Sequence, residues 1–218
     1  MNIEQARFNM IEQQIRPWDV LDPTVLSLLS VVKREDFVPE AYRAMAFMDL
    51  ELPLPGGTVM LAPRVEARLL QELAPMRHER VLEVGAGSGF MAALLGHKAQ
   101  MVTTYELRPE LASIARDNLR RAGLLNVEVR NGDGMAGDAA SAPWDAILLS
   151  GSVTEVPRTL LEQLRVGGRL VAVVGSEPLM RAERFTRISA TEWRTERLFD
   201  TVVPALEGAA TATPTFTF

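Results

Sequence analysis

The 218-residue chain has no cysteine and only two histidines, His78 and His97. Without cysteine there can be no disulfide, thiolate nucleophile, iron–sulfur cluster or cysteine-ligated zinc. The two histidines lie nineteen positions apart, which rules out the i,i+4 histidine pair of a helical zinc site. We therefore expect a protein that uses no metal ion.

Long apolar runs and an excess of basic residues are missing as well. Hydrophobic residues make up 47% of the chain, but charges or prolines interrupt every stretch before the roughly 18 residues that a membrane-spanning helix needs. The first 17 residues lack the basic and apolar regions of a secretory signal, so we expect a cytoplasmic protein with no membrane partner. With 23 basic against 28 acidic residues, the net charge of −5 disfavours a nucleic-acid partner and favours a protein or small-molecule substrate.

From Arg80 onward, short β-rich runs alternate with helical ones, as in βαβ units. Apolar runs such as AILLS and RLVAVVG predict strands that are covered on both faces. The predicted fold class is therefore α/β, with a doubly wound, mostly parallel sheet. Two further segments, RFTRISAT and TERLFDTVV, are expected to pair antiparallel at the edge of this sheet.

The first third of the chain is predicted to be helical, with a structured loop at its end. Apolar spacing predicts an amphipathic helix over residues 2–14, and Asp22-Pro23 supplies an N-cap followed by proline at the first helical position. The charged run KRED at residues 33–36 is typical of a solvated helix end. In residues 49–63, three prolines and the pair Gly56-Gly57 interrupt the helical pattern.

The strongest local motif is VLEVGAGSGF at residues 81–90, a strand that runs into a glycine-rich turn and a helix. Glycines at such a turn let backbone N–H groups approach a ligand, although the same motif also occurs as a tight turn with no ligand. The dinucleotide fingerprint GxGxxG is not matched, because Phe90 stands at the third glycine position. Glu83, two residues before the first glycine, would repel a pyrophosphate and attract a cationic cofactor such as S-adenosylmethionine.

Two more carboxylates follow predicted strands. Glu106 closes the strand MVTTYE, where it could accept hydrogen bonds from both hydroxyls of a ribose, and Asp133 follows the next strand. Each alone is typical of a solvated surface acid. Together with Glu83 they surround one glycine loop at the carboxyl ends of strands, where open α/β sheets bind ligands.

The order of the motifs MIEQQIRP, REDFVPE, LPLPGG, LAP, VLEVGAGSGF, VEVRNGDG, PWDAILLS, VPRTLLEQLRVGGRLVAVVG and VVP resembles the protein-L-isoaspartate O-methyltransferase family from about residue 9 to residue 206. The resemblance implies a seven-stranded Rossmann-like methyltransferase sheet with an N-terminal helical extension. It also implies S-adenosyl-L-methionine as cofactor, S-adenosyl-L-homocysteine as product, and methylation of isoaspartyl carboxylates during protein repair.

The same resemblance implies three regions and a set of site residues. Residues 1–75 would form a helical cap with the substrate loop, residues 76–207 the cofactor-binding core, and residues 208–218 an uncharged tail. Thr58 to Leu61 would close over the methyl group. The positions implied to contact the cofactor are Thr58, Val59, Met60, Leu61, Glu83, Gly85, Ala86, Gly87, Ser88, Gly89, Glu106, Leu107, Asp133 and Gly134.

The chain departs from the family pattern on the substrate side. Leu61 stands where the family's TISxP motif has its active-site serine, and Val203-Pro204 is followed by Ala205. Leucine cannot donate a hydrogen bond to a substrate carboxylate, so Arg64 becomes the candidate carboxylate anchor. Two alternatives stay open: a different, small or lipophilic acceptor, and a catalytically silent protein that only binds the cofactor.

Overall fold

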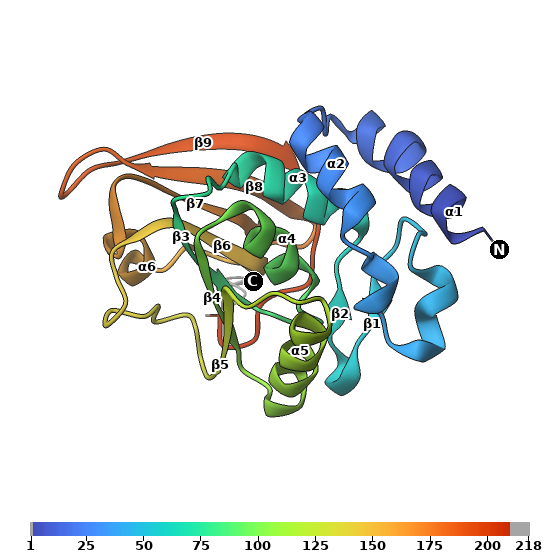
Figure 1. The fold of residues 1–218 in the computed structure, drawn as a ribbon. Coiled ribbons are helices and arrows are strands. Elements are labelled where there is room, and N and C mark those ends of the chain that lie inside the picture. The colour runs from blue at the N-terminus through green and yellow to red at the C-terminus, as the bar shows by residue number, and fades with distance from the viewer. Residues whose placement is uncertain (1, 210–218) are drawn as a thin grey trace, which may run out of the picture.

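The computed structural model describes residues 2–209 and contains a seven-stranded sheet with the order β5-β4-β3-β6-β7-β8-β9 (Figure 1). The strands from β5 to β7 are parallel, whereas β8 and β9 pair antiparallel. The strands are β3 (Arg80–Val84), β4 (Met101–Glu106), β5 (Val127–Asn131), β6 (Trp144–Val153), β7 (Leu164–Ser176), β8 (Leu179–Arg187) and β9 (Trp193–Asp200). The predicted fold class and the antiparallel edge are confirmed, although β8 begins five residues before the predicted segment.

Apolar side chains alternate between the two faces of the central strands and form two cores. One core joins the sheet to α3 (Pro63–Leu73), α4 (Phe90–Lys98) and α5 (Pro109–Arg121). The other core, around Trp144 and Leu160, packs α6 (Arg158–Glu162) on the opposite face. Because both faces of the sheet are covered, the buried runs AILL of β6 and LVAV of β7 are continuously apolar.

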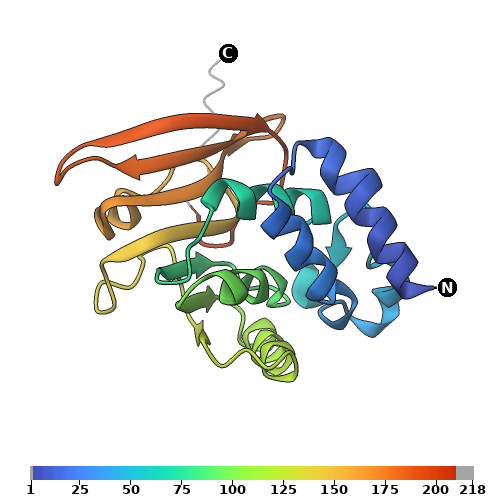
Figure 2. The ribbon, with the colours of Figure 1, turned by 45° about the horizontal axis from the view of Figure 1, so that its top comes forward.

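The N-terminal segment packs at one end of the sheet, against α3 (Figure 2). It contains α1 (Ile3–Met10), which continues as the π-helix η1 (Ile11–Ile15) and the 3-10 helix η2 (Arg16–Trp18), and then α2 (Pro23–Val31). The predicted cap of α2 is present, since the Asp22 side chain accepts a hydrogen bond of 2.7 Å from the Thr24 N–H. Among the helices of residues 2–209, none is long and apolar enough to span a membrane.

The charged run at residues 33–36 is not the solvated helix end that the sequence predicts. It forms η3 (Arg34–Asp36), in which the Arg34 side chain is 1% exposed and Glu35 is also buried. Arg34 forms an ion pair with Glu66, and its Nη2 donates to the Leu61 carbonyl at 2.7 Å. The buried charge of Arg34 is therefore compensated by residues that are distant in sequence, which the local run of charges does not reveal.

Between η3 and α3 the chain forms η4 (Glu40–Met45) and a short hairpin of β1 (Leu52–Pro53) and β2 (Val59–Met60), joined by η5 (Pro55–Gly57). After β9 the chain returns across β6. Residues 203–208, here called the strap, are fixed to Ser152: the Ser152 N–H donates to the Pro204 carbonyl and the Leu206 N–H to the Ser152 carbonyl, both at 2.9 Å. Of the predicted uncharged tail, residues 210–218 lie outside the described residues.

Candidate active site

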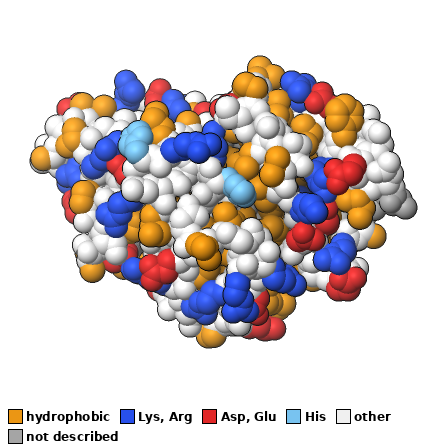
Figure 3. Space-filling view, in the orientation of Figure 1, with side chains coloured by type: hydrophobic (Ala, Val, Ile, Leu, Met, Phe, Trp, Pro, Cys, Tyr) orange, Lys and Arg blue, Asp and Glu red, His pale blue; other side chains and the backbone are white. Residues whose placement is uncertain are grey.

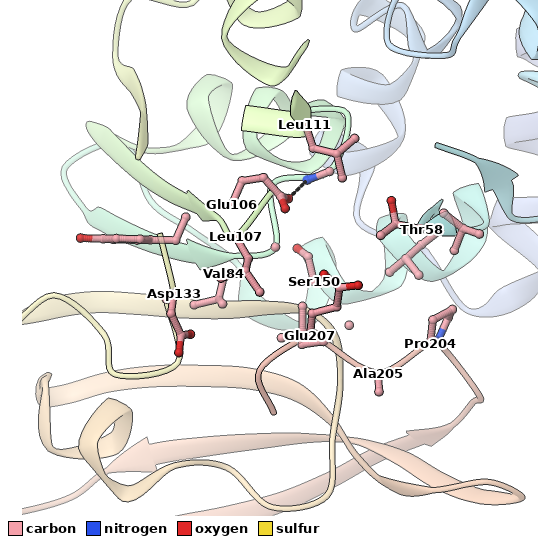
Figure 4. Close-up of a pocket in the computed structure, with 18 of the residues that line it drawn as sticks. Thr58, Val84, Glu106, Leu107, Leu111, Asp133, Ser150, Pro204, Ala205 and Glu207 are labelled. Carbon is pink, nitrogen blue, oxygen red and sulfur yellow. Dashed lines mark hydrogen bonds between the residues drawn. The ribbon is translucent and has the colours of Figure 1, made fainter. Parts of the chain in front are cut away.

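A cavity of about 220 Å³ lies at the carboxyl ends of the parallel strands. Its walls come from the β2 loop, the glycine loop after β3, the ends of β4 and β6, the loop after β5, and the strap. Figure 4 shows Asp133 at one end and Thr58 and Pro204 at the other, with Glu106 and Ser150 between them. This is the edge at which the sequence places its candidate residues.

The glycine loop has the backbone conformation that its sequence predicts. Gly85, Gly87 and Gly89 have φ angles of +95°, +51° and +86°, which side chains with a Cβ rarely adopt. A Cβ at Gly89 would lie 3.3 Å from the backbone of Ala115, so glycine also allows α5 to pack closely. Gly85 and Gly87 line the cavity, whereas Gly89 does not.

Glu106 is the most strongly positioned carboxylate of the cavity. It is 7% exposed, and the N–H groups of Gly87 and Arg108 donate to its two oxygens at 2.8 and 3.0 Å. These bonds attach the end of β4 to the glycine loop and hold the carboxylate at the cavity wall. A carboxylate fixed in this way can accept a pair of hydroxyl groups, such as those of a ribose.

Asp133, Gly134, Leu107 and the loop residues Thr58, Val59 and Leu61 also line the cavity, as the sequence predicts. The Asp133 carboxylate accepts a 2.8 Å hydrogen bond from the Met135 N–H, which fixes its orientation at the cavity rim. Met60, Ala86 and Ser88 instead line a smaller recess behind the glycine loop, of about 30 Å³. The predicted set therefore divides between the main cavity and this recess, except for Glu83 and Gly89, which line neither.

Glu83 lies beside the site and is not part of the cavity wall. Its side chain is fully buried, and the Ser150 hydroxyl, which does line the cavity, donates to it at 2.7 Å. Burial raises the pKa of Glu83 to about 7, and the nearby carboxylates of Glu66 and Glu106 add to this effect. Glu83 therefore reaches the cavity only through its hydrogen bond with Ser150. A direct contact between Glu83 and a cofactor stays a prediction.

Arg64 lies outside the residues that line the cavity. Its guanidinium forms an ion pair with Asp49 and lies 4.8 Å from the centre of the Trp18 ring. To bind an acceptor carboxylate, Arg64 would have to leave Asp49. Its role as a carboxylate anchor stays a prediction.

Several lining residues are absent from the set predicted from the sequence. They are Gly57, Val84, Tyr105, Leu111, Gly132, Ser150, Gly151, Pro204, Ala205, Leu206 and Glu207. The VVP motif of the family resemblance is the only sequence signal for the strap. Ser150 and Gly151 end the apolar run of β6, at the same sheet edge as the glycine loop, and this position could have revealed them.

The comparisons with known proteins agree with this geometry. The family profile of protein-L-isoaspartate(D-aspartate) O-methyltransferase (PCMT) matches residues 5–207. A protein-L-isoaspartate O-methyltransferase 1 of Rhodopseudomonas palustris is 41% identical over 212 residues, covering 95% of this chain and 86% of the relative. A protein-L-isoaspartate O-methyltransferase of Methanoculleus marisnigri is 41% identical over 171 residues, covering 78% of each chain.

Two solved structures share the fold. A protein-L-isoaspartate O-methyltransferase superposes with a TM-score of 0.78 at 24% identity. The match covers 91% of this chain and 65% of that chain, slightly less than two thirds of its length. A structure assigned to the same enzyme from Plasmodium falciparum, in complex with S-adenosyl-L-homocysteine, gives a TM-score of 0.78 at 19% identity, covering 95% of this chain and 99% of that chain.

Proposed function

Because the chain belongs to the protein-L-isoaspartate(D-aspartate) O-methyltransferase family, we propose that it transfers a methyl group from S-adenosylmethionine to the carboxylate of isoaspartyl residues in damaged proteins or peptides. The proposal includes a role in protein repair and a cytoplasmic location. Residues 1–75 act as a cap that carries the acceptor loop, and residues 76–207 as the cofactor-binding core.

The charge of the cavity wall is the observation that carries the cofactor assignment. Among the described lining residues, Glu106, Asp133 and Glu207 are acidic, and none is lysine, arginine or histidine. Glu207 is paired with Arg108, so Glu106 and Asp133 supply the wall's negative charge. Such a wall suits a cofactor with a sulfonium and an ammonium group and disfavours phosphate-bearing cofactors. The glycine loop and the doubly bonded Glu106 carboxylate fit the backbone and ribose of the same molecule.

The chain's own groups would contribute mainly by positioning. An isoaspartyl carboxylate has an ordinary pKa near 4, so it is ionised at pH 7 and needs no general base. When bound, the cofactor supplies an electrophilic methyl group and its own leaving group. Thr58, Val59 and Leu61 on one side and Pro204 and Ala205 on the other would hold the acceptor in line and exclude water.

Leu61 favours a second candidate, methylation of a small or lipophilic acceptor. Its side chain is 6% exposed and occupies the position of the family serine. The acceptor end of the cavity therefore presents leucine, valine, proline and alanine side chains, together with Thr58, whose hydroxyl donates to the Pro55 carbonyl at 3.2 Å. A carboxylate would lose a hydrogen bond there, at a cost of about 1–3 kcal/mol. A silent, cofactor-binding protein is the third possibility that the experiment must separate.

The test is a methylation assay with labelled S-adenosylmethionine on an isoaspartyl peptide, with the normal aspartyl peptide as control. The proposal predicts base-labile label, released as methanol, on the isoaspartyl peptide alone. The Leu61→Ser variant, assayed beside the wild type, should lower the KM for this peptide. No incorporation by either protein, with cofactor binding retained in calorimetry, would refute the isoaspartyl assignment and leave the other two candidates.

A further inference from the structure

Two charged residues outside the predicted set meet at the mouth of the cavity. Arg108 follows β4, and Glu207 is part of the strap, 99 residues later. The Arg108 Nε donates to Glu207 Oε2 at 2.8 Å, and its Nη2 donates to Oε1, so the contact is bidentate. This hydrogen bonding to Arg108 holds the pKa of Glu207 below its usual value. Glu207 itself lines the cavity, as Ser150 does, and both are labelled in Figure 4.

The Arg108 side chain also packs on the hairpin loop of the opposite wall. A Cβ at Gly56 would lie only 2.3 Å from the Arg108 Nη1, so the guanidinium rests directly on the backbone of this glycine. The next residue, Gly57, lines the cavity. Arg108 therefore connects two walls, the η5 loop and the strap, which are not joined by a direct hydrogen bond among residues 2–209.

Arg108 also contacts Glu106, the carboxylate that is proposed to bind the ribose. The backbone N–H of Arg108 donates to Glu106 Oε1 at 3.0 Å, and the Gly87 N–H donates to the other oxygen. The ion pair, Glu106 and the glycine loop thus form one connected set of contacts around the cavity.

The strap is attached firmly up to Leu206 and weakly beyond it. From Val203 to Leu206 it is held by the Ser152 hydroxyl, which donates to the Val203 carbonyl at 2.9 Å, and by the backbone hydrogen bonds of Pro204 and Leu206 to Ser152. At Glu207 the attachment is the ion pair, whose side chains are 36% and 44% exposed. Exposed ion pairs exchange readily with water, so this end can open while the anchored end stays in place.

We propose that Arg108 and Glu207 form a clasp that closes the mouth of the cavity and sets the rate at which the cofactor and its product exchange. Because Arg108 contacts both Glu207 of the strap and Gly56 of the η5 loop, breaking the pair frees the two segments from each other, and the proposal is that either molecule passes when they separate. Its effect is therefore on rates of association and dissociation more than on equilibrium affinity. The inference rests on the proposed function only for the class of cofactor.

The experiment measures association and dissociation of S-adenosyl-L-homocysteine on the immobilised protein by surface plasmon resonance. This probe lacks the sulfonium charge, so loss of one carboxylate changes its attraction to the cavity little. We expect Glu207→Gln and Arg108→Gln each to speed dissociation at least five-fold and to speed association as well. The double variant should match the single ones, since either change opens the same contact.

Asp200→Asn is the matched control. It removes one negative charge from the Arg181–Asp200 ion pair, which joins β8 to β9 at 2.7 Å and includes no residue that lines the cavity. This variant should bind with wild-type rates. High salt should speed dissociation from the wild type and leave Glu207→Gln nearly unchanged, because salt screens exposed ion pairs.

Each outcome decides the proposal. Wild-type rates in Glu207→Gln and Arg108→Gln, or the same acceleration in Asp200→Asn, would overturn the clasp and leave the cofactor assignment intact. A wild-type protein that binds no S-adenosyl-L-homocysteine would overturn the cofactor assignment and the clasp with it.

Discussion

Glu106 illustrates how a single side chain organises the cavity. Its carboxylate accepts hydrogen bonds from two backbone N–H groups of different segments, and it remains at the cavity wall. We predict that Glu106→Gln weakens S-adenosylmethionine binding by about 1–3 kcal/mol, because the amide accepts fewer hydrogen bonds and carries no charge. Titration calorimetry measures the change. The exposed Glu110→Gln, with the same change of charge, should bind as the wild type does, and equal affinities for both variants would show that Glu106 does not contact the cofactor.

Arg64 can be tested through its partner as well as directly. If it anchors the acceptor carboxylate, Arg64→Ala should raise the KM for an acidic acceptor strongly, with cofactor affinity retained, and Arg64→Lys should restore binding only in part. Asp49→Asn should then lower the KM, because it releases the guanidinium from its ion pair. Steady-state kinetics with a titration of each substrate separates these effects. A parallel loss of cofactor and acceptor binding in Arg64→Ala would instead mean that Arg64 holds the start of α3 in place.

At the scale of elements, the strands were predictable and the strap was not. Apolar runs mark β6 and β7 because these strands are buried on both faces, and the glycine loop is a local motif of ten residues. The strap depends on a fit between distant residues: Leu206 fills the space above Gly85 and Gly151. A sequence alone does not show which later side chain occupies the space that a glycine leaves.

The same reason explains the buried charge of η3. Arg34, Glu66 and the Leu61 carbonyl meet although they are up to 32 residues apart. Local sequence shows only four consecutive charged residues, which are usually solvated. The contact matters for the site, because Arg34 fixes the backbone of the loop that carries Leu61.

The fit of the strap against β6 can be tested with a second glycine. A Cβ at Gly151 would lie 2.9 Å from the Leu206 Cγ and 3.1 Å from the Pro204 carbonyl oxygen. We predict that Gly151→Ala lowers the free energy of unfolding by about 1–3 kcal/mol, as overpacking usually does. Adding Leu206→Ala should recover part of this loss, because it removes the nearest atoms. Urea denaturation of the two single variants and the double variant measures the coupling, and strictly additive effects would show that the two residues do not press on each other.

Over the whole molecule, the surface carries mixed charges, whereas the interior contains individual buried carboxyl groups. On the face in Figure 3, basic side chains are interspersed with acidic and hydrophobic ones. The interior, in contrast, contains Glu66 and Glu83, and burial raises the pKa of each to about 7. Arg34 offsets this shift in part for Glu66 through an ion pair, whereas for Glu83 neutral hydrogen-bond donors such as the Ser150 hydroxyl offset it.

Glu83 makes stability depend on pH in the direction opposite to that of most acids. Between pH 5 and pH 7 the folded state holds a proton on Glu83 that the unfolded state has released, so the free energy of unfolding should fall as pH rises through this window. Acids whose pKa is lowered by ion pairs, such as Glu79 with Arg169, act only below their unfolded pKa of about 4.3. We therefore predict maximal stability near pH 5 in the protein without cofactor.

Urea denaturation at half-unit steps from pH 5 to pH 8 measures this dependence. Glu83→Gln should flatten the curve, because the amide stays neutral at every pH in the range, and the variant should be the more stable protein at pH 8. Glu110→Gln, exposed at the start of α5, should keep the wild-type slope. A wild-type curve that is flat or rises across the window would mean that Glu83 is ionised in the folded protein throughout. Its negative charge would then be present beside the cavity at every pH in the range, and binding of a cationic cofactor would not change its protonation.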